Sequence, residues 1–572
     1  MAERVRKKSR RQARGEEASR PAGSTSKSAP RGGTWLQNAL TAGLVILPAA
    51  AYLNALDNPF VYDDGATVVT NPSLQDSSNL AYVLVYERFR PLVNLSYALD
   101  HRLWGLWPFG YHLTNLVLHI VNVLLFFSVV QHMQRDRGTG DSHPAGSWKT
   151  LALPAFVAAI FAVHPMMTEA VGYVSGRAEV LCATFFLAAW LWLRRAIVQN
   201  RKLLLIPALL TWCLALASKE VAVMLPAVAI LYDFILLEPE RRRESKRLFW
   251  LHLPFLALVA TMGVARASAY LGSEASFEPT AFFRYFLTEL VVIWRYIGLL
   301  LLPVHQSVVH SVREMTHVST AVFLAGVGLM AVVWLAWRFR RKWPLAALGA
   351  FWFLLLLLPT TIVPLRELMA EHRVYLASCG FFLLVGELLN GAAQWLKSAE
   401  RSGDSTPATV AAMAIVGVLC VATMARNAVW DDPVSLWRDA ATKAPDVNAP
   451  HYQLGNVLRE NGDCNEAIPH YRRAVDLVPE HWNAWNNLGI CLASLKRYDE
   501  ARWTFQKAIE LQPTYARGYN NLGTLAKSQG LFAEARQHFL RALELDPGNE
   551  IAAQQLNALP DISPASSQSV QP

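Results

Sequence analysis

A repeat with a period of 34 residues fills the last fifth of the chain and constrains its fold more than any other feature. Leucine recurs at this spacing as Leu454, Leu488 and Leu522, and a glycine follows each of them. Alanines and a closing proline recur at the same spacing. Such a unit is typical of two short antiparallel helices that stack on identical neighbours to form a solenoid.

The period and its residues indicate tetratricopeptide (TPR) repeats. We predict three repeats at residues 450–556. A half-repeat at 428–449 precedes them, because Trp437, Ala440 and Pro445 occupy the matching positions one period earlier.

Amide side chains recur within the repeats as well. Asn487 and Asn521 lie one repeat apart on the helices that would line the groove of the array. A primary amide both donates and accepts, so this ladder can hold the backbone of a protein acceptor. The alternative interpretation is that asparagine simply suits a solvated helix face.

The composition of the remaining chain indicates a membrane protein. Hydrophobic residues make up 53% of the sequence, charged residues 17%, and the mean hydropathy is +0.22. Residues 1–33 hold ten Lys/Arg against three acids, so most of the net charge of +9 belongs to a predicted disordered tail and does not indicate nucleic-acid binding. Residues 557–572 form a second such tail. The six cysteines match neither a disulfide framework nor a metal site, and we expect no metal or other cofactor.

We therefore predict an all-α chain in which a membrane domain, residues 34–427, precedes the TPR solenoid. About eleven apolar segments are long enough to be membrane spans. They lie near 35–56, 112–132, 150–165, 178–194, 203–217, 221–237, 248–268, 317–337, 343–362, 373–395 and 408–426. The first is interpreted as an uncleaved signal anchor because no small-residue cleavage site follows it.

Basic clusters set the expected orientation. They lie at the N-terminus and at 194–202, 241–247, 338–342 and 397–401. All of them fall on the cytoplasmic side only if the ambiguous segment 284–303 does not cross and is instead interfacial or re-entrant. The N-terminus is then cytoplasmic and the TPR array lies outside, in the periplasm of a bacterium or the ER lumen of a eukaryote.

The loops on the outer side carry the polar residues. The first begins with Asp63 and Asp64, directly after a span, where an unpaired carboxylate is costly. This pair suits a general base with a positioning neighbour, or alternatively an Asx turn. Within the same loop, residues 88–104 are predicted to form an amphipathic helix on the membrane surface.

The second outer loop contains His164, Glu169 and Arg177. The arginine has the planar fork that binds phosphate, but it can equally form an ion pair with a nearby glutamate.

Two further outer segments add charges. Lys219 and Glu220 lie in a turn between two spans, where an exposed salt bridge is the plainer interpretation. Glu367, Glu371, His372 and Arg373 lie at the outer start of the tenth predicted span, and Arg373 alternatively anchors that span at the interface.

An ordered set of motifs resembles one known family. The strings are NPFVYDD, FRPL with YHLTNLVLH, HPMMTEAVGYVSGRAE, SKEVAVMLP and ELMAEHRVYL, followed by the TPR units. Together they resemble the transmembrane and TPR-repeat-containing proteins, relatives of the protein O-mannosyltransferases.

The resemblance implies a GT-C type glycosyltransferase that uses a polyprenyl-phosphate-linked sugar. It places the acidic motif on Asp63 and Asp64, with Asp63 as the base. Arg177, Arg373 and Lys219 are the candidates for the lipid phosphate. The supporting candidates are His164, Glu169, Glu220, Glu371 and His372.

The predicted function is therefore transfer of a sugar to a hydroxyl, with protein Ser/Thr as the favoured acceptor and inversion at the anomeric carbon. Two alternatives remain at this point. One is an enzyme of the O-antigen ligase or polymerase type that acts on glycan or lipid, and the other is a non-catalytic membrane-anchored TPR scaffold.

Overall fold

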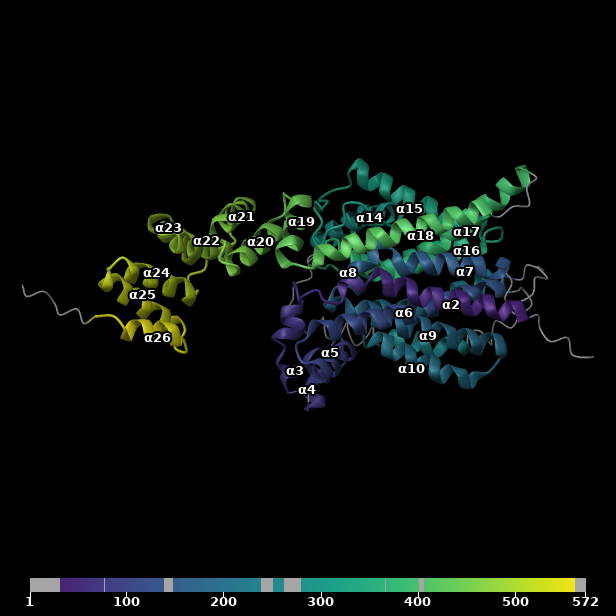
Figure 1. Cartoon of the computed structure of the whole chain (residues 1–572), viewed down its shortest axis with the longest axis horizontal. Coiled ribbons are helices and arrows are strands. Elements are labelled where there is room, and N and C mark those ends of the chain that lie inside the picture. Colours follow the sequence, from purple (N-terminus) through teal and green to yellow (C-terminus); the bar gives the residue numbers. More distant parts are fainter. Residues whose placement is uncertain are drawn as a thin grey trace, which may run out of the picture.

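The computed structural model describes residues 31–560 apart from 77, 138–147, 238–249, 262–278, 366 and 401–405. Every regular element in this described part is a helix, which confirms the predicted all-α class. An apolar bundle and a solenoid follow one another along the long axis of the molecule (Figure 1). The tails predicted at 1–33 and 557–572, and the basic cluster at 241–247, lie largely outside the described residues.

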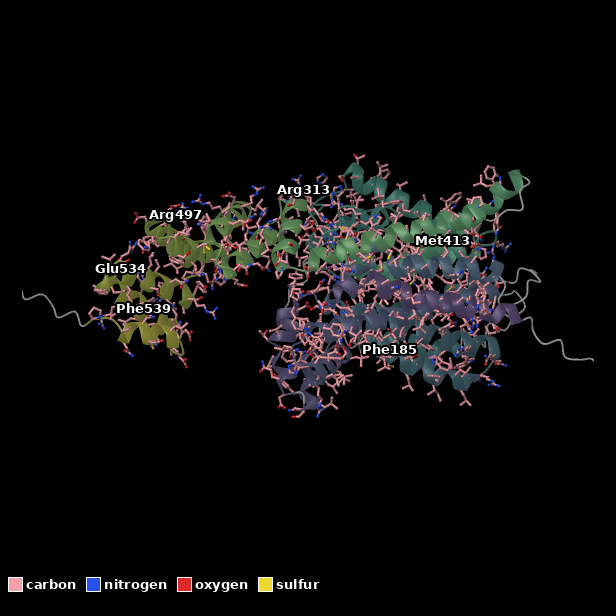
Figure 2. The ribbon with its side chains drawn as sticks, viewed as in Figure 1. Phe185, Arg313, Met413, Arg497, Glu534 and Phe539 are labelled. Atoms are coloured by element: carbon pink, nitrogen blue, oxygen red, sulfur yellow. The ribbon has the colours of Figure 1, made fainter. Side chains whose placement is uncertain are left out.

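Long helices that run roughly parallel to one another form the bundle. They are α2 (Arg31–Ala51), α6 (Pro108–Asp136), α7 (Trp148–Val163), α9 (Arg177–Gln199), α10 (Leu205–Leu216), α11 (Leu225–Leu236), α15 (Thr320–Phe339), α16 (Pro344–Ile362), α17 (Tyr375–Glu400) and α18 (Thr406–Asn427). Large apolar side chains lie on the outside of the bundle as well as within it, such as Met413, which is 62% exposed (Figure 2). Helices that are apolar on all sides are suited to a lipid environment.

The long helices support a multi-pass membrane protein. Seven described helices are long and apolar enough to cross a membrane, or eight if the bent pair Thr150–Val163 and Pro165–Val171 is one span. Helices α10 and α11 match two more predicted spans but have 12 residues each. At about 1.5 Å per residue, each covers roughly 18 Å of a hydrocarbon core about 30 Å thick. Short 3₁₀ turns, η5 (Lys202–Leu204) and η6 (Glu220–Met224), extend them.

The predicted outer loops meet at the end of the bundle next to the solenoid, which we call the TPR end. There the Tyr62 hydroxyl donates to Glu367 and the Glu371 amide donates to Glu169. At the opposite end, Arg194 of a predicted cytoplasmic cluster pairs with Asp136 at 2.5 Å. This separation is the one that the charge pattern predicts.

Helix α14 (Pro279–Leu301) covers the ambiguous segment and lies entirely at the TPR end. Near its start Tyr285 donates to Thr360, at the last turn of α16, and near its end Tyr296 donates to Ala370. Both partners belong to the TPR end, so α14 does not traverse the bundle. The structure agrees with the prediction that this segment does not cross.

The solenoid begins with the single helix α19 (Pro433–Lys443) and continues in antiparallel pairs. These are α20 (Asn448–Glu460), α21 (Cys464–Leu477), α22 (Trp482–Ser494), α23 (Tyr498–Leu511), α24 (Ala516–Ser528) and α25 (Phe532–Leu545), followed by α26 (Glu550–Asn557). The recurring glycine allows close packing within each pair, because a Cβ on Gly489 would lie 2.6 Å from the Phe505 ring. The glycine that recurs in the sequence at this spacing therefore has a packing role in each repeat.

Candidate active site at the TPR end

The first outer loop folds back over the bundle through short helices. They are η2 (Gly65–Val69), α3 (Pro72–Gln75), α4 (Leu80–Tyr86) and α5 (Pro91–Trp104). Helix α5 corresponds to the amphipathic segment predicted at 88–104. Prolines at the first turns of α3 and α5 suit these starts, because proline lacks the N–H that a first turn leaves unpaired.

Asp64 is completely buried and joins the first and second outer loops. Its carboxylate accepts from the Ser175 amide at 2.8 Å, from the Ser175 hydroxyl at 2.6 Å and from the Val61 amide at 3.2 Å. Burial raises the pKa of Asp64 to about 7, although the bonds from Ser175 and Val61 act in the opposite direction. With no exposed surface and three donors, Asp64 is placed to hold the loops together.

Asp63 differs from its neighbour because it is exposed, although protein atoms surround much of its carboxyl group. Its backbone amide donates to the Tyr173 hydroxyl at 2.9 Å, and its carbonyl accepts from Thr67 at 2.8 Å. Burial and the charge of Glu367 raise the pKa of Asp63 above its ordinary value, while the Tyr173 hydroxyl lowers it. A partly exposed carboxylate with a raised pKa has the properties of a general base.

Glu367 links the Asp63 loop to Arg373. It accepts from the Tyr62 hydroxyl at 2.7 Å, and its carbonyl accepts from Arg373 Nη2 at 2.7 Å. Burial, followed by the bond to Glu367, raises the pKa of Tyr62 above its usual range. The predicted base and one predicted phosphate-binding arginine are thus two residues of one connected cluster.

Arg373 retains free donor capacity. Its side chain is 7% exposed, and its Nη1 is buried without a hydrogen-bond partner among the described residues. Glu289 of α14, 2% exposed, likewise has an unpartnered carboxylate oxygen. A buried unpaired donor costs about 1–3 kcal/mol, so such a nitrogen is a reasonable place for an anionic ligand.

Arg177 is enclosed instead. It has no exposed surface; Nη1 lies 2.7 Å from Asp100 Oδ2, Nη2 donates to the Tyr111 carbonyl at 2.9 Å, and Nε donates to Asn115. Each of its three nitrogens therefore has a protein partner. The geometry favours a scaffolding role, and we leave Arg177 out of the proposed phosphate site.

Glu169 anchors the segment before α17. It accepts from the backbone amides of Glu371 and His372, at 2.8 and 3.3 Å, and lies 2.6 Å from His372 Nδ1. Glu371 is 1% exposed, and its carboxylate binds His310 at 3.0 Å and the Ser307 amide at 2.8 Å. These two glutamates tie the second outer loop to the segment that follows α14 and to the segment that precedes α17.

The side chains of the remaining predicted residues also have protein partners. Lys219 is buried and pairs with Glu179, not with its neighbour Glu220, so the exposed salt bridge considered for this turn is not formed. Glu220 lies 3.7 Å from Arg90. His164 caps a 3₁₀ turn by accepting from the Met166 amide, and its other ring nitrogen lies 3.2 Å from the Leu300 carbonyl.

A row of polar side chains on one face of α6 forms hydrogen bonds to these loops. His112 and Asn115 contact the carbonyls of Asn58 and Tyr173, both at 3.0 Å. One and two turns further on, His119 and Asn122 bind the Tyr375 hydroxyl, at 2.7 and 3.1 Å. In the described residues, no three His, Cys, Asp or Glu side chains are arranged to share a metal ion.

The sequence did not single out several residues that complete the site. Tyr62 lies inside the motif that predicted Asp63, so proximity to that motif was the available signal, whereas Glu367 was named in the charged cluster of Arg373 but given no role. Tyr173 lies four residues before Arg177 in the same loop. His310 follows α14, in a segment without a recognisable pattern, and only the fold brings it to Glu371.

The TPR array joins its amides to one another. Asn487 donates to Asn456 at 2.9 Å, Asn486 donates to Asn487 at 3.1 Å, and Asn521 donates to Asn486 at 2.7 Å. The predicted ladder therefore exists as a chain of bonds between repeats. Part of the hydrogen-bonding capacity of these amides is therefore used within the array itself.

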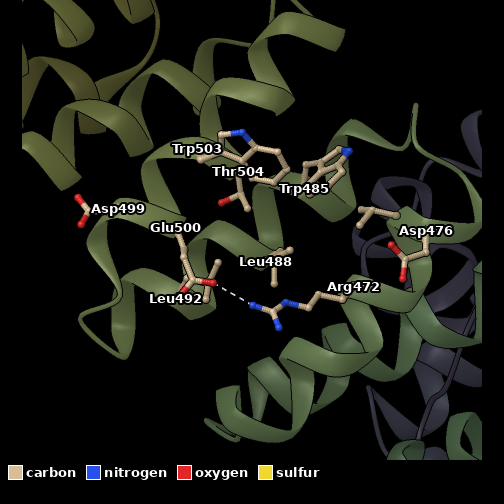
Figure 3. A pocket seen from close by; sticks show the side chains of 10 residues that line it. Arg472, Asp476, Trp485, Leu488, Leu492, Asp499, Glu500, Trp503 and Thr504 are labelled. Atoms are coloured by element: carbon tan, nitrogen blue, oxygen red, sulfur yellow. Dashed lines mark hydrogen bonds and ion pairs between the residues drawn. The ribbon is translucent and has the colours of Figure 1, made fainter.

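A separate cavity of about 450 Å³ lies in the array between α21, α22 and α23 (Figure 3). Trp485 and Trp503 meet edge to face at 5.2 Å on one side, and Arg472 and Glu500 form an ion pair at 2.9 Å on the other. None of the predicted site residues lines it.

Comparison with known proteins agrees with both parts of the chain. Tetratricopeptide-repeat family models match residues 452–516 and 516–549. Protein O-mannosyl-transferase F38B6.6 of Caenorhabditis elegans is 26% identical over 464 residues, which cover 77% of this chain and 62% of the relative. Protein O-mannosyl-transferase TMTC1 of Homo sapiens is 26% identical over 523 residues, covering 78% and 56%.

The chain is a homologue of the TMTC-family protein O-mannosyl-transferases. Tmtc3 of Drosophila melanogaster gives a similar match, 26% identical over 540 residues, with 79% of this chain and 56% of the relative covered. The chain therefore spans about 56–62% of the length of these relatives.

Solved structures match only a small part of the chain. The first TPR of Spaghetti (RPAP3) bound to an HSP90 peptide is 25% identical and covers 19% of this chain and 87% of that structure, with a TM-score of 0.19. The second TPR domain of human RPAP3 is 27% identical, covers 19% and 89%, and has a TM-score of 0.18.

Proposed function

We propose that this protein transfers a sugar from a polyprenyl-phosphate-linked donor to Ser or Thr hydroxyls of a protein acceptor at the TPR end of the bundle. The observation that carries this proposal is the cluster around Glu367, which accepts from Arg373 and from Tyr62, the residue before Asp63, and whose charge raises the pKa of Asp63. Homology to named protein O-mannosyl-transferases supports the reaction class and favours mannose as the sugar.

Asp63 is proposed as the general base. The acceptor oxygen forms a bond to the anomeric carbon while its proton passes to the Asp63 carboxylate. The bond between the anomeric carbon and the phosphate oxygen breaks, and its electron pair leaves with the lipid phosphate. One direct displacement of this kind inverts the anomeric centre.

Arg373 is proposed to bind the leaving phosphate through its unpartnered Nη1. A guanidinium positioned where negative charge develops stabilises the transition state more than the ground state. Lys219 is too fully paired with Glu179 to share this role.

The site lies where a lipid-linked donor would reach it, because the polyprenyl tail remains in the bilayer beside the bundle. We propose that the TPR end faces the periplasm or the ER lumen, as the basic clusters indicate. Reporter fusions directly after the last described residue, Pro560, test this: an active periplasmic phosphatase fusion is expected, and a fluorescent cytoplasmic fusion would overturn the proposal.

The array is proposed to capture the protein acceptor. Asn487 and Asn521 are the candidate contacts, using the amide capacity that remains outside their bonds to one another.

Reconstitution tests the reaction. The purified full chain in liposomes is given a radiolabelled polyprenyl-phosphate mannose together with a Ser/Thr peptide, a glycan acceptor and a lipid acceptor in parallel. We expect label in the peptide and none with Asp63→Asn. Label in glycan or lipid alone would favour a ligase-type enzyme, and no transfer to any acceptor would favour a scaffold.

A further inference from the structure

Four aromatic rings connect the first helix of the solenoid to the Asp63 loop. Trp437 of α19 meets Tyr62 edge to face at 5.3 Å and 79°, and Tyr62 stacks on Tyr173 at 6.2 Å and 25°. Trp430 lies against the same Tyr173 at 5.3 Å. We call these four residues the aromatic junction.

The aromatic junction is part of a continuous apolar core. Trp430, Trp437 and Tyr173 are 2%, 3% and 4% exposed, and Val61 beside Tyr62 is 5% exposed. Their hydrophobic cluster extends without interruption into the interior of the repeats. The solenoid therefore meets the bundle through a packed interface, and no exposed linker separates Trp437 from the loop.

Polar contacts fix α19 from two other directions. Lys443 donates to the Gln306 carbonyl at 2.6 Å, and Gln306 in turn donates to Glu371 at 3.0 Å. At the end of the bundle, Arg426 pairs with Asp439 of α19 at 2.8 Å. Helix α19 is thus held against the same segments that build the candidate active site.

The backbone conformation of Tyr62 links this packing to the adjacent Asp63. Its φ is +54°, in the left-handed region that residues with a Cβ rarely adopt unless their surroundings impose it. Trp437 and Tyr173 hold the ring, and Glu367 holds the hydroxyl. Because Asp63 is the next residue, the direction of its carboxylate depends on keeping Tyr62 in this conformation.

We infer that Trp437 is a positioning residue for the Asp63 carboxylate, acting through Tyr62, so that the leading half-repeat is part of the catalytic unit. This inference rests on the proposed function. It means that the solenoid shapes the active site as well as binding the acceptor. Its first helix cannot be exchanged or displaced without altering the base.

Kinetics of the full chain with a short Ser/Thr peptide test the inference, because such a peptide does not need the groove. Trp437→Ala is expected to lower kcat about a hundredfold, the loss that a misplacement of about 1 Å can cause, with KM changed less than about threefold. Trp437→Phe retains a ring and should restore most of kcat.

Trp503→Ala is the matched control. Trp503 is also a tryptophan of the array, but it is 51% exposed and contacts Trp485 far along the solenoid from the aromatic junction. Its kcat should equal that of the unaltered protein. An unchanged kcat in Trp437→Ala, or an equal loss in Trp503→Ala, would overturn the inference.

Hydrogen–deuterium exchange gives a second measurement that needs no activity. In the loop, the Asp64 amide donates to the Val61 carbonyl at 3.0 Å and the Thr67 amide donates to the Asp63 carbonyl at 2.8 Å. Trp437→Ala should speed exchange at these amides while residues 516–549 stay protected. Unchanged exchange at 61–67 would refute the positioning role, even if the protein proved to have no transferase activity.

A variant that loosens the whole array would obscure both measurements. If residues 516–549 also lose protection in Trp437→Ala, Trp437→Leu decides the question because it keeps apolar volume at the position without an aromatic edge. A reduced kcat with a protected array supports the inference, and a normal kcat overturns it. If the unaltered protein shows no transferase activity but Trp437→Ala still speeds exchange at 61–67, the structural coupling between Trp437 and the loop stands and the proposed function is wrong.

Discussion

Two neighbouring regions at the TPR end contain the same kinds of residue but differ in how fully their polar atoms are paired. In the floor, around Arg177, the guanidinium has no exposed surface and binds Asp100, Asn115 and Tyr111. In the rim, Asp63, Glu367 and Arg373 form a cluster that is partly exposed and in which Arg373 Nη1 has no partner. The sequence predicted Arg177 and Arg373 for the same role.

The difference shows that the remaining capacity to form bonds, and not the residue type, distinguishes a binding site from a scaffold. A buried ion pair must recover the hydration that both charges lost, and Arg177 does so by using every nitrogen on the protein itself. The rim residues have protein partners for only some of their hydrogen-bond donors and acceptors. Changes in the floor should therefore affect stability, and changes in the rim should affect catalysis.

The largest effect is expected in the rim, for Asp63→Asn. The amide keeps the shape of the side chain but cannot accept the acceptor proton, so kcat should fall by about 10²–10⁴-fold without loss of folded protein. Rates of sugar transfer measure it, and the exposed Asp76→Asn in the same loop is the control. Near-normal turnover in Asp63→Asn would move the base elsewhere, with Glu169 the next candidate.

The floor is tested by Arg177→Ala. Removing the guanidinium leaves Asp100 buried without its ion-pair partner, which should lower the free energy of unfolding by about 3–5 kcal/mol. Thermal unfolding in detergent measures this loss. Arg438→Ala, which removes an ion pair that is 51% exposed on both sides, should have little effect. A stable Arg177→Ala protein that fails to bind the donor would return this residue to the phosphate site.

Arg373→Ala should weaken donor binding with little change in stability. The loss of a hydrogen bond to a charged group, about 1.5–3 kcal/mol, corresponds to roughly a tenfold to hundredfold rise in the KM for the donor. Lysine should restore it poorly, since it lacks the planar fork. The control is Arg90→Ala, a more exposed arginine on the same face. Unchanged donor affinity would make Arg373 an interfacial anchor.

The pH dependence of kcat should show the charge coupling within the rim. Burial and Glu367 raise the pKa of Asp63, so the base stays protonated and inactive to a higher pH than an isolated, fully solvated aspartate would. Glu367→Gln removes the negative charge and should move the acid limb of the kcat profile to lower pH. A shift in the opposite direction, or none, would separate Asp63 from Glu367.

The smallest effect is expected in the array. Replacing Asn487 and Asn521 together by alanine should raise the KM for a long protein acceptor by about threefold to tenfold, the worth of one or two ordinary hydrogen bonds. Transfer to a short peptide should be unchanged, because these amides lie away from the rim. Equal losses on both acceptors would indicate that they act by supporting the solenoid.

The array was the most predictable part of the molecule. Each repeat packs mainly on its neighbours, so residues one period apart in sequence, such as Gly489 and Gly523, occupy equivalent positions in space. The charge pattern likewise sufficed to group the outer loops at one end and to keep 284–303 from crossing. Helix lengths were less predictable, since the first residues of two predicted spans form the 3₁₀ turns η5 and η6, and α10 and α11 begin only after them.

The sequence by itself determined the helical class, the repeat register and the placement of polar loops at one end, because these depend on local periodicity and on charge counted along the chain. Only the tertiary structure decided which polar residues remain available. Asp63 and Asp64 are adjacent, yet the three donors from Val61 and Ser175 converge on Asp64 alone. Ser175, which supplies two of these donors, lies 111 residues further along the chain, and no local pattern records which carboxylate so distant a partner will enclose.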